Sequence, residues 1–244
     1  MKIKLLITYD GTDFCGWQVQ DGKRTVQGEI ENAIELVTGE RVRVTGSGRT
    51  DSGVHAEGQV AHFVTEKEGI PPEKFAYAIN VRLPEDVKIL KSERASDDFD
   101  ACRTAKRKTY RYSLYFSDVE KPLLNRYATM IYKKPNLEIM REGAKAFVGE
   151  HDFKVFNASG GGAKTTVRTI YNINIEENGE RIDVSVTGNG FLYNMVRTLV
   201  GTLLEVGYGD KTKKDLKEML ESGDRTKCGR TLTAKGLSLI KVEY

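Results

Sequence analysis

The chain has 244 residues, of which 39% are hydrophobic and 30% charged, and it carries a net charge of +3 at pH 7. This composition is typical of a soluble globular protein, and no apolar run approaches the length of a membrane span. Three widely separated cysteines and three histidines without ligand spacing give no disulfide framework and no metal site. With a charged strand at the start in place of a signal sequence, these features predict a cytoplasmic protein without a metal.

The first hundred residues alternate between strand and helix patterns. Alternating hydrophobicity predicts strands at 2–9, 42–45, 58–65 and 87–93. Thr25 is a suitable cap for a helix that Gly39 ends, with Ile30, Ala33, Ile34 and Val37 on one face. Pro71 and Pro72 open a second helix that runs to Val81. The order β-α-β-β-α-β is that of ferredoxin-like folds.

The second half repeats this order with more elements. We expect strands at 110–116, 128–132, 166–176, 181–187 and 236–242, and helices at 137–147, from Gly190 and from Lys211. The sequence therefore predicts an α+β fold of two ferredoxin-like halves, 1–105 and 106–244, whose mostly antiparallel sheets join. The glycine tract Ser159–Gly162 predicts a mobile loop.

The glycine-rich stretch from Gly46 to Phe63, GSGRTDSGVHAEGQVAHF, is the most informative part of the chain. It follows one strand pattern and runs into the next, so Arg49 and Asp51 lie in a loop, where catalytic side chains are often presented. An aspartate in such a turn also commonly bonds its own backbone. A nucleotide site is excluded, because the pattern lacks the third glycine and the following helix of a GxGxxG motif.

Five cations lie within the nine residues from Arg103 to Arg111, and tyrosines interleave with them or follow them. A charge run is commonly a solvated face. Cations that hold phosphates, beside rings that stack on unpaired bases, also make an RNA surface. On a strand, Tyr110 and Tyr112 point to one face and Arg111 to the other.

The stretch from Gly188 to Gly209 predicts a core helix, because its apolar residues fall on one broad arc. Arg197 lies at the edge of that arc. Such an arginine either reaches outward to solvent or turns inward, and if it turns inward it needs a partner. A carboxylate in a glycine loop, such as Asp51, would form a charge-assisted pair with it.

The loop around Asp51, the basic tract and the arginine helix together resemble the tRNA pseudouridine synthase A family. So do YDGTDFCGWQVQ, from Tyr9 to Gln20, and AKGLSLIKVEY at the end of the chain. The resemblance covers essentially the whole chain in the family's order. It implies a pseudouridine synthase fold with a central catalytic cleft, no cofactor, and a homodimer in which each RNA spans both subunits.

The implied reaction converts uridine to pseudouridine at positions 38 to 40 in the anticodon stem-loop of tRNA. By the same resemblance, Asp51 matches the catalytic aspartate, Tyr110 the tyrosine that stacks on the target base, and Arg197 the basic residue that pairs with the aspartate. Arg49 matches the arginine linked to opening of the RNA stack. We expect further RNA contacts from a set of cations: Arg24, Arg103, Lys106, Arg107, Lys108 and Arg111.

The sequence leaves open both the chemical role of Asp51 and two alternative functions. Asp51 could attack the sugar, attack C6 of the base, or take the 2′ proton on a glycal route, and the sequence favours none of the three. An RNA-binding module without catalysis would need the basic tract but not Asp51. A carboxylate-dependent enzyme acting on a free nucleoside would need Asp51 but not the basic tract.

Overall fold

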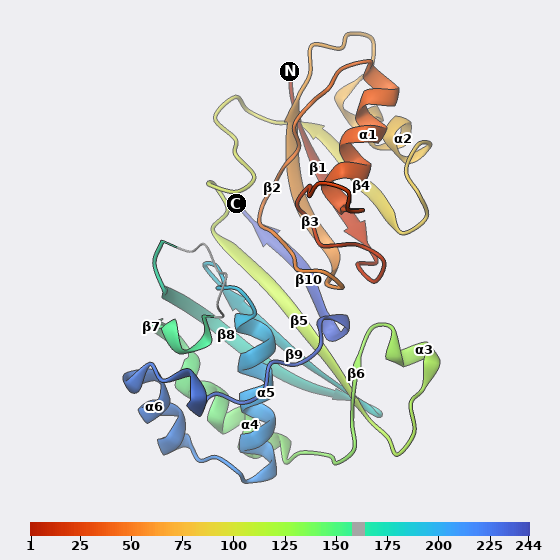
Figure 1. The fold of residues 1–244 in the computed structure, drawn as a ribbon. Helices are drawn as coiled ribbons and strands as arrows, with labels where there is room; N and C mark the ends of the chain where they lie inside the picture. The colour runs from red at the N-terminus through yellow and green to blue at the C-terminus, as the bar shows by residue number, and fades with distance from the viewer. Residues whose placement is uncertain (158–163) are drawn as a thin grey trace. The chain divides into compact units, whose positions relative to one another are not determined.

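The structure, a computed structural model, describes residues 1–157 and 164–244 (Figure 1). The predicted loop at Ser159–Gly162 lies outside the described residues. The chain divides into two compact units, Met1–Lys106 with Ser238–Tyr244, and Arg107–Leu237. The first boundary lies one residue from the predicted one. The last strand, however, belongs to the first unit, although the sequence prediction places it in the second.

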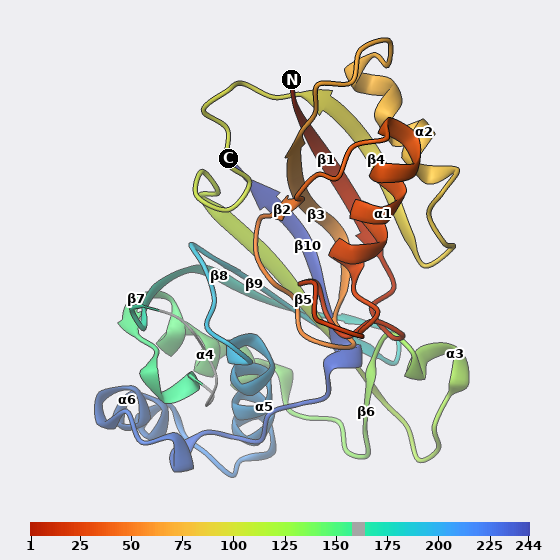
Figure 2. The ribbon, with the colours of Figure 1, turned by 45° about the horizontal axis from the view of Figure 1, so that its top comes forward.

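The first unit is a sheet with two helices on one face (Figure 1 and Figure 2). Its elements are β1 (Lys2–Tyr9), α1 (Val26–Thr38), β2 (Thr45–Gly46), β3 (His55–Val64), the 3-10 turn η1 (Pro72–Lys74), α2 (Phe75–Asn80), β4 (Val87–Arg94) and β10 (Leu237–Glu243). The sheet order is β4-β1-β3-β10, with β2 also paired to β3. The pairs of β1 with β3 and β4 are antiparallel, and β10 runs parallel to β3. The ferredoxin-like order predicted for this half is confirmed.

Helix α1 forms where its pattern predicts it. The Thr25 side chain accepts a hydrogen bond from Gly28 N at 3.3 Å, and Gly39 ends the helix in the left-handed conformation with φ 79°. Ile30 and Ile34 are fully buried. The fourth core position is Thr38 rather than the predicted Val37, because the Thr38 hydroxyl donates to Ile34 O at 2.8 Å and is satisfied inside the helix.

Strand β2 is much shorter than the predicted strand at 42–45. The backbone of Val44 is bonded to side chains of α1 instead of to a neighbouring strand. Val44 N donates to Glu31 Oε1 at 2.8 Å, and Gln27 Nε2 donates to Val44 O at 3.1 Å. Because the N–H and C=O groups of Val44 are hydrogen-bonded in this way, the segment pairs with β3 only from Thr45.

The second unit packs helices on one face of a longer sheet (Figure 2). Its strands are β5 (Arg107–Phe116), β6 (Thr129–Ile131), β7 (Gly149–Asp152), β8 (Val167–Asn178) and β9 (Arg181–Gly188). Its helices are α3 (Pro122–Asn125), α4 (Leu137–Ala144), α5 (Met195–Tyr208) and α6 (Lys213–Ser222), with short 3-10 turns η2 (Lys145–Phe147), η3 (Lys154–Phe156), η4 (Arg225–Lys227) and η5 (Ala234–Gly236). Strands β5, β9, β8 and β7 pair antiparallel in that order, and β6 runs parallel to β5.

The core of the second unit is built on α5. All seven apolar residues of the predicted arc are buried: Leu192, Met195, Val196, Leu199, Val200, Leu203 and Leu204. The helix begins at Met195 rather than Gly190, because Asn194 before it is left-handed, with φ 60°. A Cβ on Gly201 would lie 2.0 Å from Arg230 O, so a glycine is needed where the 230–232 segment crosses the helix. Among the described residues, no helix is long and apolar enough to cross a membrane.

Candidate active site

Asp51 lies in the loop between β2 and β3, and its side chain is half-buried. The loop turns back at its end, where Val54 N donates to Asp51 O at 3.1 Å and Gly53 has φ 78°. Its beginning is fixed by Gln59, which accepts from Ser47 Oγ at 2.6 Å and donates to Gly48 O at 3.0 Å. Asp51 is therefore presented by a loop whose beginning is bonded to β3 and whose end is closed by a turn just before β3.

A second loop, residues 10–24, packs directly on the Asp51 loop. Trp17 N donates to Thr50 O at 3.0 Å, and Ser52 Oγ donates to Phe14 O at 3.1 Å. These bonds hold the two residues that flank Asp51. The hydroxyls of Tyr9 and Thr50 share a further hydrogen bond of 2.8 Å. Burial raises the pKa of Tyr9 to about 12, so its hydroxyl keeps its proton at neutral pH.

Two glycines of the second loop make this close approach possible. A Cβ on Gly16 would lie 2.7 Å from Thr50 O and 3.3 Å from the carbonyl carbon of Asp51, and Gly16 has φ 85°. A Cβ on Gly11 would lie 2.0 Å from Val54 O. Any side chain at either position would push the backbone around Asp51 away.

The buried side chain of His55 also contacts the 10–24 loop. His55 is 4% exposed, and its Nδ1 accepts from Gly11 N at 3.0 Å and lies 3.2 Å from Asp10 Oδ1. Sequence reasoning did not single out Tyr9, Trp17, Thr50 or His55. The signal that could have found the first two is the motif YDGTDFCGWQVQ, which is rich in aromatic residues and glycine and was used only for the family resemblance.

The other two candidate catalytic residues lie in the second unit. Tyr110, on β5, is 9% exposed and meets the ring of Phe191 edge-on, with ring centroids 5.3 Å apart and an interplanar angle of 85°. Arg197, in the first turn of α5, is half-buried. Its Nε donates to Leu232 O at 2.7 Å, and its Nη1 donates to Asn194 Oδ1 at 2.6 Å. These two bonds fix the plane of the guanidinium instead of letting it reach into solvent.

The proposed RNA contacts differ in how they are held. Arg49, Arg103, Lys106 and Arg107 are exposed, whereas Lys108 and Arg111 are half-buried. The Arg107 guanidinium lies over the ring of Tyr171, at 4.8 Å from its centroid. This stack places a cation beside an exposed aromatic ring, as in surfaces that bind single-stranded RNA.

Two carboxylates bind the guanidinium of Arg24. Its Nη1 and Nη2 donate to the two oxygens of Asp86 at 2.7 and 2.9 Å, and its Nε donates to Glu29 Oε1 at 2.9 Å. The hydrogen bond to Asp86 raises the pKa of Arg24 above its ordinary value. These three hydrogen bonds fix the position of the Arg24 guanidinium.

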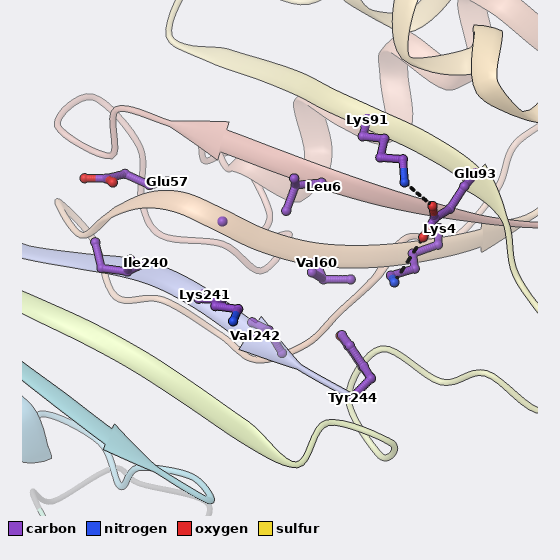
Figure 3. Close-up of a pocket in the computed structure, with 11 residues that line it drawn as sticks. Lys4, Leu6, Glu57, Val60, Lys91, Glu93, Ile240, Lys241, Val242 and Tyr244 are labelled. Atoms are coloured by element: carbon purple, nitrogen blue, oxygen red, sulfur yellow. Dashed lines mark hydrogen bonds and ion pairs between the residues drawn. The ribbon is translucent and has the colours of Figure 1, made fainter. Parts of the chain in front are cut away.

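A hollow on the sheet of the first unit contains none of the candidate residues (Figure 3). It lies on the face of β1 that carries Lys4 and Leu6, opposite the buried residues of that strand. Three charged residues of its lining pair with one another, since Glu93 accepts from Lys4 at 3.1 Å and from Lys91 at 2.5 Å. We assign no ligand to this hollow.

Comparison with protein-family models gives one match, described as tRNA pseudouridine synthase, over residues 5–102 and 144–244. The chain belongs to the tRNA pseudouridine synthase family. It is therefore an enzyme, an isomerase, and its mixed α+β fold with mostly antiparallel strands is consistent with the pseudouridine synthase fold.

Relatives within this family match along their full length. A tRNA pseudouridine synthase A from Acetivibrio thermocellus is 46% identical over 243 residues, which cover 100% of this chain and 99% of the relative. A tRNA pseudouridine synthase A 2 from Clostridium perfringens is also 46% identical, with the same coverage. Among solved structures, a chain of a Cbf5-Nop10-Gar1 complex is 14% identical with a TM-score of 0.34, and the match covers 83% of this chain and 54% of that one.

Proposed function

We propose that this pseudouridine synthase modifies uridines 38, 39 and 40 in the anticodon stem-loop of tRNA, with Asp51 as the catalytic carboxylate. Membership of the family gives the class of reaction. The position of Asp51 in the structure is the observation that supports its catalytic role. Asp51 is half-buried in a loop whose flanking residues, Thr50 and Ser52, are each bonded to the 10–24 loop. A carboxylate fixed in this way is pre-organised for attack or proton transfer.

The reaction exchanges one bond at the sugar for another without redox change. The bond from N1 of uracil to C1′ breaks, the base rotates, and C5 bonds to C1′. The C5 proton is lost to solvent and N1 gains a proton. A uridine in the stem is out of reach until it is flipped out of the stack, and we propose that Arg49, which is exposed two residues before Asp51, assists that opening.

Asp51 serves any of the three routes, as a nucleophile towards C1′ or C6 or as the base that removes the 2′ proton. Each route needs the carboxylate ionised where water is excluded. We propose that Arg197 pairs with Asp51 in the working enzyme and stabilises the charged form of its carboxylate. The two bonds from Arg197 to Leu232 and Asn194 support this role, because they orient the guanidinium before substrate arrives.

The test is release of tritium from uridine labelled at C5, measured with bulk tRNA and with free uridine, followed by mapping of the modified positions. We expect release from tRNA, at positions 38 to 40, and none from free uridine. Release from free uridine would favour a nucleoside-modifying enzyme. Binding of tRNA without release would favour an RNA-binding module, and would contradict the proposed function.

Tyr110 is proposed to stack on the flipped uracil. We expect Tyr110→Phe to bind tRNA normally but react slowly, because the ring is kept and the hydroxyl is lost. Tyr110→Ala should also lose base capture, since stacking on a base is worth about 1–3 kcal/mol. Single-turnover rates and tRNA dissociation constants measure the two effects. Tyr77→Ala, at a 76% exposed ring on α2, is the control, and wild-type kinetics in Tyr110→Ala would remove Tyr110 from the site.

We also propose that the enzyme acts in the cytoplasm as a homodimer whose two chains share each tRNA. With a net charge of only +3, the cations that hold the backbone must be concentrated locally. The affinity for tRNA should therefore fall steeply with salt, with a log–log slope of several units, and loss of Arg103 or Lys106 should reduce that slope by about one. Sedimentation with and without tRNA across a salt series measures the oligomeric state and the salt dependence of tRNA binding. A fully active monomer, or an affinity independent of salt, would contradict this proposal.

A further inference from the structure

Both ends of the 10–24 loop are bonded to one residue, Asp86, and the Arg24 side chain makes the bonds at the second end. The Asp86 carboxylate receives two hydrogen bonds from the Arg24 guanidinium, at 2.7 and 2.9 Å. The Asp86 carbonyl accepts from Asp10 N at 2.9 Å. Asp86 lies immediately before β4. The two ends of the loop are thus tied to the same point on the sheet edge.

The pair of Arg24 with Asp86 is stronger than an ordinary surface ion pair. An isolated ion pair between exposed side chains contributes little to folding stability, whereas a bidentate pair with fixed geometry contributes more. Arg24 is 37% exposed and Asp86 is 23% exposed. The Arg24 guanidinium also stacks on Phe14, with its central carbon 4.2 Å from the ring centroid, and Glu29 on α1 accepts its remaining Nε–H at 2.9 Å.

From Arg24 the contacts run to the residues on either side of Asp51. The carbonyl of Phe14, whose ring lies under Arg24, accepts from Ser52 Oγ at 3.1 Å. The carbonyl of Arg24 accepts from Cys15 N at 2.8 Å, which holds the chain just before Gly16. Gly16 is the residue at which a Cβ would lie 2.7 Å from Thr50 O and 3.3 Å from the Asp51 carbonyl carbon.

We propose that Arg24 is a positioning residue, which sets the backbone of the Asp51 loop through the 10–24 loop and does not bind RNA itself. The proposal rests on the proposed function, because the position of Asp51 matters only if Asp51 is catalytic. It assigns Arg24 a role different from the other cations of the predicted RNA surface. A displacement of about 1 Å at a catalytic group costs up to about a hundredfold in rate.

The experiment compares Arg24→Ala, Asp86→Asn and the double variant in kcat, in the tRNA dissociation constant and in its salt slope. We expect both single variants to lower kcat by about tenfold to a hundredfold while leaving binding and salt slope unchanged. The double variant should be no slower than either single one, because the two residues act as one unit. Arg24→Lys should not restore the rate, since a lysine cannot form the bidentate pair.

Arg41→Ala is the control for loss of an arginine that pairs with a carboxylate, because Arg41 bonds to Glu35 at 3.0 Å but is 88% exposed. A phosphate contact at Arg24 would give the opposite pattern. Arg24→Ala would then weaken binding and lower the salt slope by about one, and Asp86→Asn would do neither. A fall in thermal stability with unchanged kcat would also overturn the proposal, because it would show a merely structural role.

Hydrogen exchange of the segment 47–54 provides a readout that does not depend on activity. Exchange there should be faster in Arg24→Ala and Asp86→Asn than in the wild type and in Arg41→Ala. If the wild type releases no tritium from tRNA, the proposed function fails, and the exchange data still decide whether Arg24 holds the Asp51 loop. Unchanged exchange in both variants would overturn the inference even in an active enzyme.

Discussion

Asp51→Asn is expected to abolish pseudouridine formation, with a fall in single-turnover rate of at least about a thousandfold. The amide keeps the shape of the side chain but is neither a nucleophile nor a base. Binding of tRNA should persist, because the cations that hold the phosphates are unchanged. The hydrogen bonds made by Thr50 O, Ser52 Oγ and Val54 N do not involve the Asp51 carboxylate, so these bonds should persist in the variant.

Tritium release under single-turnover conditions, together with a tRNA dissociation constant, measures this result. Asp21→Asn is a suitable control, since Asp21 is an exposed carboxylate on the neighbouring loop and the substitution makes the same change in charge. A rate within tenfold of the wild type would remove Asp51 from the reaction. If weaker binding of tRNA accounts for the whole loss of rate, Asp51 acts in RNA recognition instead.

Arg197→Leu is expected to lower both activity and stability. The leucine removes the donors to Leu232 O and to Asn194 Oδ1, and hydrogen bonds from a charged group contribute about 1.5–3 kcal/mol each. Asn194 is the left-handed residue directly before α5 and is held by Arg197, so the start of the core helix should loosen. The free energy of unfolding should fall by about 3 kcal/mol, since solvent reaching the half-buried site recovers part of the loss.

Denaturant unfolding measures the stability, and activity is then compared at a temperature where the variant remains folded. Arg225→Leu, at an exposed arginine of the same unit, is the control for removal of a charge. The catalytic part of the prediction is a coupling with Asp51. In a double-mutant cycle for activity, Asp51→Asn should make the further change at Arg197 nearly silent. Independent, additive effects would mean that the two residues do not pair.

Local patterns along the chain predicted much of this fold because they act over a few residues. The Thr25 cap, the Gly39 stop and the apolar arc of α5 each depend on side chains within one or two turns. The alternation in β1 and β9 was equally clear. The short strand β7, Gly149–Asp152, was missed, because GEHD has no alternation and becomes a strand only by pairing with β8.

In the candidate site, too, some residues were recognisable from the sequence and others only from the fold. Its central residues stood out in the sequence, Asp51 by its glycine-rich loop and Arg197 by its place on an apolar helix. Sequence alone assigned Arg24 to RNA binding, because a lone arginine in a loop has no visible partner. Its partner Asp86 is 62 residues away and follows an unrelated helix. Only the folded chain brings the two together.

Patterns in the amino-acid sequence alone predicted the order and type of most elements, the glycine-rich loop that presents Asp51 and the family to which the chain belongs. The distant segments that support that loop became visible only in the folded chain: the 10–24 loop with its glycines, His55, which accepts from Gly11 N, and β10, which pairs with the start of β3. The two kinds of interaction differ in their range along the chain. Caps and periodicity are set by neighbours along the chain, whereas strand partners, ion pairs and backbone contacts depend on which surfaces fit when the chain is compact.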